Sequence, residues 1–141
     1  MPLPNMADRR AYHFDELLEL RPYTDAAETA DANETGVAFN ARAIDLAKVV
    51  VNHAAIGGTV DESNYWEINV QISDAVGGTY TTVATTGILG TAAATIELPL
   101  SGAFNEYADD DALFIRVQAD ETGSTAGSLT YGAYITPGTK C

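Results

Sequence analysis

The sequence predicts an all-β fold: an antiparallel β-sandwich of jelly-roll-like form, with about seven or eight strands and an extended N-terminal arm. First, apolar and polar residues alternate with a period of two from Gly36 onward, as in strands with one buried and one solvated face. Second, glycine-rich turn signals separate these segments at intervals of roughly ten residues. Third, no long helical pattern lies between them. We therefore expect an arm over residues 1–36 and a sandwich over residues 37–141.

The predicted arm differs in composition from the rest of the chain. It holds eight of the 20 acidic residues and three of the five prolines. Its segment HFDELLEL places Phe14, Leu17 and Leu18 at helical spacing before Pro22 ends the pattern, which predicts a short helical turn with one apolar face. Because polar termini are ordered only when something holds them, we expect the arm to pack on its own domain or on a neighbouring subunit.

The sandwich strands follow from the alternation and from residue type. The most regular pattern is WEINVQIS, residues 66–73, and TIELPL, residues 95–100, and ALFIRVQAD, residues 112–120, repeat it. Pro99 indicates that its strand lies at a sheet edge or a bulge, because proline cannot donate to a strand ladder. Four further segments are rich in β-branched or aromatic residues. They are VAFNARAIDL (37–46), KVVVNHAAI (48–56), TYTTVATTGI (79–88) and SLTYGAYIT (128–136).

One region allows two interpretations. The segment RAIDLAKVVVNHAA, residues 42–55, also fits the period of an amphipathic helix, but its three consecutive valines favour a strand. The apolar positions in this region change from even to odd numbers. That change predicts a bulge or a strand break near Ala47 and Lys48.

The charge and the cysteine content exclude several classes of partner and site. Seven basic residues against 20 acidic ones give a formal charge of −13, which repels nucleic-acid phosphates and anionic lipids. We therefore expect neither a nucleic-acid nor a membrane partner. Cys141 is the single cysteine, so the chain forms no internal disulfide. No apolar run is long enough to span a bilayer, and MPLPNMADRR is unlike a secretion signal, which predicts synthesis in the cytoplasm.

The sequence offers little catalytic chemistry, and we expect a protein that is not an enzyme and has no cofactor. No serine lies in a G-x-S-x-G elbow, and phosphate loops and paired-cysteine metal motifs are absent from the sequence. Of the two histidines, His13 lies in the arm, and His53 shares its strand face with Val49 and Val51, which favours a half-buried structural role. These observations favour a structural or binding module.

Acidic residues leave two alternatives open. The run Asp109–Asp111 has the oxygen ligands that calcium prefers, but it lacks a recognised loop spacing, so we favour a solvated loop and predict no metal site. A hydrolase would need a carboxylate pair across a cleft, and nothing in the spacing indicates such a pair. The residues available for it are Glu62, Glu67, Asp109 and Asp111.

Tyrosines are the candidates for partner binding within the sandwich. Tyr65 and Tyr134 fall on the strand face opposite the predicted core, and tyrosine buries a ring while its hydroxyl stays in water. Such exposure is typical of a subunit interface or a ligand platform, and packing at the edge of the core is the alternative. Together with the arm, the predicted partner-binding residues are Phe14, Leu17, Leu18, Tyr23, Tyr65 and Tyr134.

The run YWEINVQISDAVGGTYTTVATTG, residues 65–87, with DALFIRVQADETG and LTYGAYITPG downstream, resembles the sandwich of tailed-phage capsid decoration (cement) proteins. The resemblance implies a structural virion protein on the outer capsid surface that binds neighbouring major capsid subunits, commonly as a dimer or trimer with an extended arm. Similar strands occur in galactose-binding-like modules, with Ser73-Asp74, Gly77-Gly78 and Tyr80-Thr81 as counterparts. The alternative function is therefore a carbohydrate-binding module for adhesion to a host, whose aromatic platform disappears if Trp66 lies in the core.

Overall fold

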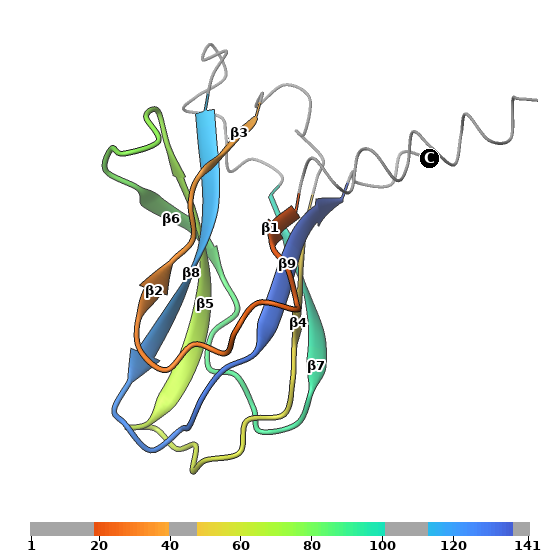
Figure 1. Ribbon diagram of the computed structural model, residues 1–141, viewed down its shortest axis with the longest axis vertical. Helices are drawn as coiled ribbons and strands as arrows, with labels where there is room; N and C mark the ends of the chain where they lie inside the picture. Colours follow the sequence, from red (N-terminus) through yellow and green to blue (C-terminus); the bar gives the residue numbers. More distant parts are fainter. Residues whose placement is uncertain (1–18, 40–47, 101–112, 137–141) are drawn as a thin grey trace, which may run out of the picture.

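The computed structural model describes residues 19–39, 48–100 and 113–136, which form nine strands and no helix in two packed antiparallel sheets (Figure 1). The first sheet has the order β1-β9-β4-β7, and the second has the order β2-β8-β5-β6 with β3 also paired to β8. The strands are β1 Glu19–Arg21, β2 Ala32–Asn33, β3 Val37–Phe39, β4 Lys48–His53, β5 Tyr65–Ser73, β6 Thr81–Thr85, β7 Ala94–Pro99, β8 Leu113–Thr122 and β9 Tyr131–Thr136.

The strand pairing is that of a jelly roll. β2 and β3 both pair with β8, at positions Ala119 to Gln118 and Ile115 to Leu113, so they act as one interrupted strand. Counted this way, the described residues form eight strands. The first pairs with the last, the second with the seventh, the third with the sixth and the fourth with the fifth. A long hairpin folded over into two sheets has this pattern. The predicted all-β jelly-roll-like sandwich is confirmed.

Each of the seven predicted sandwich segments contains a strand of the structure. The alternative helix over residues 42–55 is wrong for residues 48–53, because these form β4 between β7 and β9. The bulge or strand break was predicted near Ala47 and Lys48. Ala47 lies outside the described residues, and Lys48 is the first residue of β4, paired with Pro99 and Thr136. Pro99 ends β7, which is an edge strand as predicted, since β7 pairs only with β4 in the order of the first sheet.

The boundary between arm and sandwich differs from the prediction. Residues 19–36 contain β1, which pairs with β9, and β2, which pairs with β8, so this stretch contributes a strand to each sheet. Its polar composition suggested a linker, but both short strands lie at sheet edges, where few inward-facing residues are needed. Residues 1–18, including the predicted helical turn, lie outside the described residues.

The core lies between the two sheets and consists of the inward residues of each strand. Trp66 is fully buried at 0% exposure, and its indole Nε1 donates to the carbonyl of Gly127 at 2.8 Å, which satisfies the polar edge of the ring. His53 is buried on the β4 face that Val49 and Val51 share, with Nδ1 2.8 Å from the carbonyl of Ala54. Each buried aliphatic or aromatic side chain stabilises the fold by about 1.5–3 kcal/mol.

Candidate functional site

The structure separates the predicted partner-binding residues into two groups. Tyr23 and Tyr134 come together on the outer face of the first sheet, whereas Tyr65 lies on β5 in the second sheet. The arm residues Phe14, Leu17 and Leu18 lie outside the described residues.

Gly132 allows Tyr23 to reach the outer face of β9. A Cβ atom at Gly132 would lie 2.9 Å from the backbone nitrogen of Tyr23 and 3.0 Å from its Cα, so a larger residue would displace the chain that follows β1. Gly132 and Tyr134 are two residues apart in β9 and therefore face the same side of the sheet. The exposed ring of Tyr23 thus belongs to the same surface as Tyr134.

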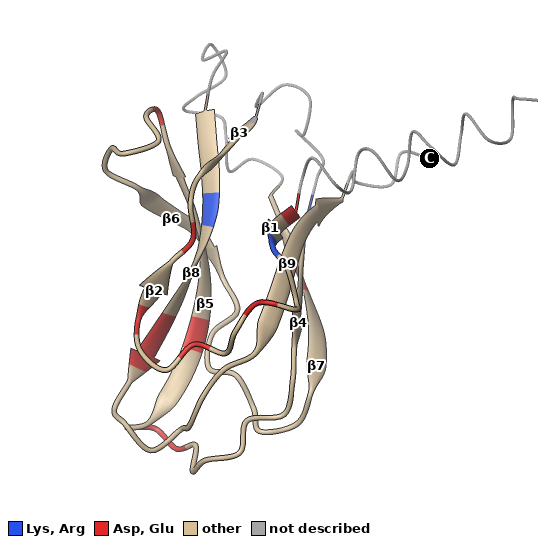
Figure 2. Ribbon diagram, viewed as in Figure 1, with Lys and Arg blue, Asp and Glu red and all other residues tan. Residues whose placement is uncertain are grey.

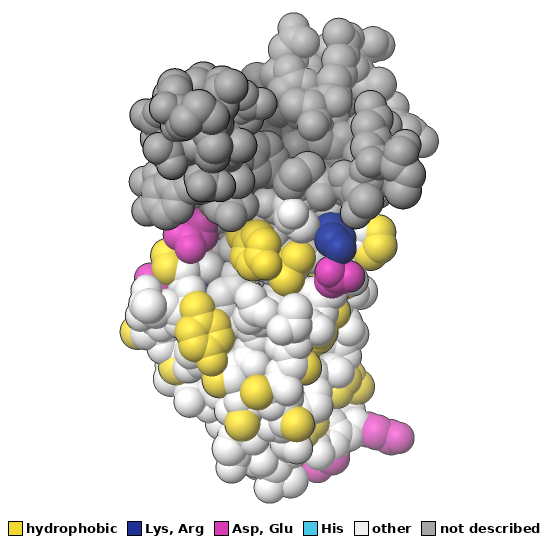
Figure 3. Space-filling view, turned by 90° about the vertical axis from the view of Figure 1, so that its right-hand side faces the viewer, with side chains coloured by type: hydrophobic (Ala, Val, Ile, Leu, Met, Phe, Trp, Pro, Cys, Tyr) yellow, Lys and Arg dark blue, Asp and Glu magenta, His cyan; other side chains and the backbone are white. Residues whose placement is uncertain are grey.

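The rest of this surface mixes charged and uncharged side chains. On the outer face Tyr134 stands between Val50 and Glu19, and Gly132 stands beside Asn52. Val50 is buried at 5% exposure, and Glu97 stands opposite it on β7. The Asn52 side chain accepts a 2.7 Å hydrogen bond from the hydroxyl of Thr95. Figure 3 views this side of the molecule and shows hydrophobic side chains scattered among uncharged ones, with charged side chains toward the borders of the described surface. We call the outer face around Tyr23, Tyr134, Val50, Asn52 and Thr95 the tyrosine face.

An ion pair marks one border of the tyrosine face. Nζ of Lys48 lies 2.7 Å from Oε1 of Glu97, across the β4–β7 pair. Both side chains are solvated, so the pair contributes at most about 1 kcal/mol to stability. Figure 2 shows acidic residues on β5 and β8 and next to β2, while most of β9 and β7 is uncharged.

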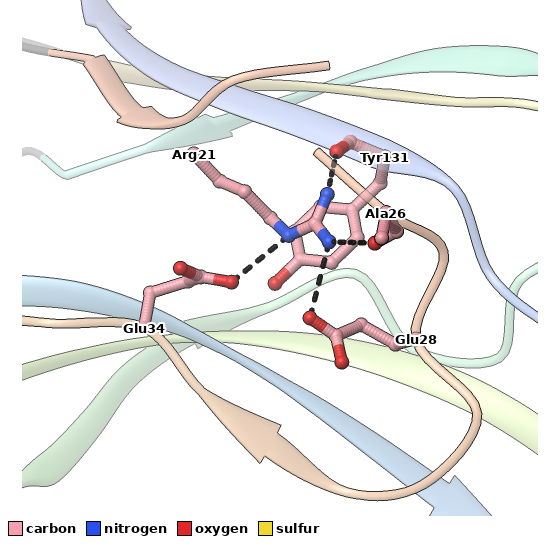
Figure 4. A network of polar contacts seen from close by, with 5 residues as sticks. All are labelled: Arg21, Ala26, Glu28, Glu34 and Tyr131. Carbon is pink, nitrogen blue, oxygen red and sulfur yellow. Dashed lines mark hydrogen bonds and ion pairs between the residues drawn. The ribbon is translucent and has the colours of Figure 1, made fainter. Parts of the chain in front are cut away.

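A buried guanidinium network holds the chain on either side of Tyr23 (Figure 4). Arg21 at the end of β1 has a side chain only 1% exposed, and it donates from Nε to Glu34 at 2.9 Å and from Nη2 to Glu28 at 3.0 Å. It also donates to the backbone carbonyls of Tyr131 and Ala26. The network thereby ties β1 to β9 and to the segment that crosses to the second sheet.

The Tyr131 ring completes this network. The guanidinium carbon of Arg21 lies 4.4 Å from the centre of the ring, within cation–π range. Burial by itself lowers the pKa of Arg21. The hydrogen bonds to Glu28 and Glu34, the charge of Glu34 and the nearby Tyr131 together raise the pKa by more, so the net shift is upward. Burial, followed by the charge of Glu34, raises the pKa of the Tyr131 hydroxyl well above its usual range. Both groups therefore keep their protons, as a structural site requires.

The outer face of the second sheet carries a connected row of polar side chains. Arg116 donates to Oε1 of Gln71 at 2.9 Å, Gln71 donates to Oε1 of Gln118 at 3.2 Å, and Gln118 donates to Oδ1 of Asn33 at 2.9 Å. The alternation predicted that Gln71 points away from the core, and it does so. It is nevertheless only 7% exposed, because Arg116 and Tyr80 close over that end of the face.

The described carboxylates form no metal site. No group of three or more histidine, cysteine, aspartate or glutamate side chains suited to a metal ion occurs within residues 19–39, 48–100 and 113–136. Glu67 lies opposite Asp120 in the β5–β8 pair, on an open sheet face. Asp109–Asp111, the predicted acidic loop, lies outside the described residues.

Sequence reasoning missed two features of these surfaces. The Arg21 network joins residues 110 positions apart in the chain, and no local pattern indicates such a contact. The row of amides has a signal in the sequence, namely the polar positions that alternate with the core residues of WEINVQIS and ALFIRVQAD. Those positions indicated solvent exposure but not their hydrogen-bonding partners.

Comparison of the chain with models of protein families gives no match. Comparison with curated proteins likewise gives no match. In the described part of the chain, no helix has the length and apolar character needed to cross a membrane.

Proposed function

We propose that this protein is a structural virion protein that decorates and stabilises a phage capsid by binding neighbouring major capsid subunits. The observation that carries the proposal is the position of β1. Glu19, its first residue, pairs with Tyr134, and Leu18 directly precedes Glu19 in the chain. The first described residue after the arm therefore lies beside Tyr134 of the tyrosine face.

The physical chemistry of the tyrosine face suits a protein partner. Tyrosine supplies rigid contact area at low entropic cost, and its hydroxyl tolerates the solvated state before binding. The tyrosine, asparagine and threonine side chains of this face are uncharged, so removing them from water costs less than removing charged groups. Many such contacts, repeated over a shell and combined with the arm, raise the effective concentration and so the strength of attachment. The strong negative charge elsewhere keeps an outward-facing protein soluble.

The proposal predicts which tyrosines are required for attachment. Purified protein is added to capsids assembled without it, and bound protein is measured by co-sedimentation. Tyr23→Ser with Tyr134→Ser should weaken attachment by about tenfold or more, because two anchors of one surface are lost. Tyr65→Ser is the matched control on the other sheet and should leave attachment unchanged. An equal loss of attachment in the Tyr23/Tyr134 double variant and in the Tyr65 variant would contradict the assignment of the tyrosine face.

The arm is tested separately. Deletion of residues 2–18 keeps every described strand and should leave a folded sandwich that no longer attaches to capsids. A longer deletion would remove β1 and the Arg21 network and would confuse binding with folding. Undiminished attachment of the 2–18 deletion would overturn the role of the arm.

One argument for the alternative function, a carbohydrate-binding module, was an aromatic platform formed by Trp66. Trp66, which would have provided an aromatic platform, is fully enclosed in the core. Titration with monosaccharides, with and without calcium, distinguishes the two functions. Sugar binding by a protein that does not attach to capsids would favour the module.

A further inference from the structure

On the outer face of the second sheet, basic and acidic residues lie on opposite sides of a neutral centre. On this face β5 and β8 present alternate residues that stand opposite one another as rungs of a ladder. The three central rungs are Gln71 with Arg116, Asn69 with Gln118, and Glu67 with Asp120. Their charges run from basic through neutral to acidic. Because each step is two residues, the basic and acidic rungs lie at equal distances of about 6.7 Å from the neutral rung.

The basic rung holds its cation in a fixed orientation. Nε of Arg116 donates to Gln71 at 2.9 Å, and the guanidinium carbon lies 3.8 Å from the centre of the Tyr80 ring. Arg21 and Lys48 are paired with carboxylates, whereas Arg116 makes no ion pair with any described residue. The two Nη groups, which form the end of the guanidinium fork, donate to no acceptor in the described residues. They are suited to a carboxylate supplied from outside.

No cation among the described residues forms an ion pair with the acidic rung. Glu67 and Asp120 stand directly opposite each other, an arrangement that is unfavourable for like charges on paired strands. Burial, followed by the charge and hydrogen bond of Asp31, raises the pKa of Asp120. The carboxylate of Asp31 itself accepts a 2.7 Å hydrogen bond from the backbone of Glu121 and is held in place. A cation brought to this rung would relieve the repulsion.

We infer that this face binds the same face of a second copy of the chain about a two-fold axis through the rung of Asn69 and Gln118. Such an axis places Arg116 of each copy over Glu67 and Asp120 of the other. The neutral amides meet at the axis. In an isologous interface each contact occurs twice, so one fixed guanidinium per copy serves both acidic rungs. Figure 2 shows the basic position toward one end of β8 and the acidic positions toward the other.

Charge complementarity favours a second copy over another partner. An acidic segment of a different protein would meet Arg116 but would be repelled by Glu67 and Asp120 on the same surface, and a basic segment would face the reverse conflict. A second copy in antiparallel orientation satisfies both ends at once. At physiological ionic strength the screening length is about 8 Å, so these contact pairs act while the overall negative charge of each copy is largely screened.

The outermost rungs are compatible with this arrangement. The next rung beyond the acidic one pairs Tyr65 with Thr122, and the next beyond the basic one pairs Ser73 with Phe114. The same two-fold axis brings Tyr65 of one copy toward Phe114 of the other. Ser73 is buried, and Tyr65 and Phe114 are half-buried, so the exposed parts of these two rings supply the apolar contact area at the ends of the interface. This gives Tyr65 a role distinct from that of Tyr23 and Tyr134.

Sedimentation equilibrium of the purified chain at physiological ionic strength tests the inference. The wild-type protein should show a reversible monomer–dimer equilibrium. Arg116→Glu, and separately Glu67→Lys with Asp120→Lys, should each weaken the dimer by about tenfold or more, because each creates repulsive contacts twice. An equimolar mixture of the two variants should recover the dimer, since the only complementary pairing is then between unlike copies. A wild-type protein that stays monomeric, or a mixture that does not recover, would overturn the inference.

Two controls keep the result specific. Lys48→Glu makes the same change of charge on the other sheet and should leave the dimer unchanged. The variant with Glu67→Lys and Asp120→Lys does not depend on the Arg116–Tyr80 stack, so it tests the interface even where Arg116→Glu disturbs the local fold. The measurement uses no capsids and does not rest on the proposed function. If no dimer is found, attachment through the tyrosine face can still be correct. If attachment to capsids is not found, the dimer inference can still be correct.

Discussion

At the scale of single residues, the buried cation Arg21 has the largest structural effect. Its side chain is almost fully enclosed, and its two carboxylate partners, Glu28 and Glu34, are each 22% exposed. Bringing a guanidinium out of water costs several kcal/mol, which the carboxylates, two carbonyls and the Tyr131 ring offset. Loss of the cation leaves two carboxylates close together without a counter-charge. The network is therefore sensitive to change at its centre.

Arg21→Ala is expected to lower the free energy of unfolding by about 3 kcal/mol, because it leaves buried acceptors and like charges uncompensated. Chemical denaturation at neutral pH measures the loss. Lys48→Ala, which breaks the solvated Lys48–Glu97 pair, is the control and should change stability by less than about 1 kcal/mol. Similar losses in the two variants would show that Arg21 is not the anchor described.

At the scale of elements, the segment from β1 to β3 supplies the short strands that complete both sheets. β1 pairs with β9, and β2 and β3 pair with β8, so the chain crosses between the layers within residues 22–31. This crossing places Asp31 next to Asp120 at the end of β8, and Asp31 adds to the effect of burial in raising the pKa of Asp120. The same crossing carries Tyr23 over Gly132. Both surfaces of the molecule thus depend on it.

The pKa shift of Asp120 predicts a pH dependence of stability. Its folded-state pKa is raised above the ordinary value of 3.8, so the folded chain holds the proton more tightly and the ionised carboxylate destabilises the fold at neutral pH. This cost disappears as the pH falls through the raised pKa. Asp120→Asn should therefore stabilise the dilute protein at neutral pH by a few tenths of a kcal/mol, because the side chain is largely solvated, and should have little effect below pH 3.8.

Asp61 gives the control of opposite sign for this measurement. Hydrogen bonds from Ser63 and Asn64 lower its pKa, so its ionised form contributes stability that is present above 3.8 and is lost as the pH falls. Asp61→Asn should destabilise the protein at neutral pH. Thermal unfolding across the acidic range distinguishes the two variants, and the same sign for both would contradict the assignment.

At the scale of the whole molecule, the fold is dominated by contacts between distant parts of the chain. The first described strand pairs with the last, through Glu19 and Tyr134, and the central strands of both sheets come from separate parts of the sequence. Such pairing requires large loops to close before their contacts form. The two outer faces follow from the same topology: the first sheet carries the tyrosine face, and the second carries the charged ladder.

This topology predicts slow folding. Refolding followed by the fluorescence of Trp66, the single and buried tryptophan, should take about a millisecond to a second, as in other folds of high contact order. Refolding within microseconds would be inconsistent with strand pairing of this kind. The 2–18 deletion should refold at a similar rate, because it keeps every described strand.

The sequence by itself determined the strands β3 to β9 and the core of this protein. Alternation in WEINVQIS and ALFIRVQAD depends only on neighbouring residues, since successive side chains of a strand point to opposite faces. That local rule predicted the burial of Ile68 and Val117 and, together with the turn signals, the fold class, while the missing N–H of Pro99 predicted an edge strand or a bulge. It also placed Tyr65 and Tyr134 away from the core.

Only the tertiary structure decided which outward residues share a surface. Tyr23 joins Tyr134 because β1 pairs with β9, and Tyr65 is separated from them because β5 belongs to the other sheet. Arg21 is buried where the chain crosses between layers, because it meets Glu28 and Glu34 of the crossing segment and Tyr131, which is 110 positions away. These are contacts between residues far apart in sequence, and their free energy depends on strand pairing that no short pattern encodes. The local period therefore specified the strands, and the topology specified the surfaces.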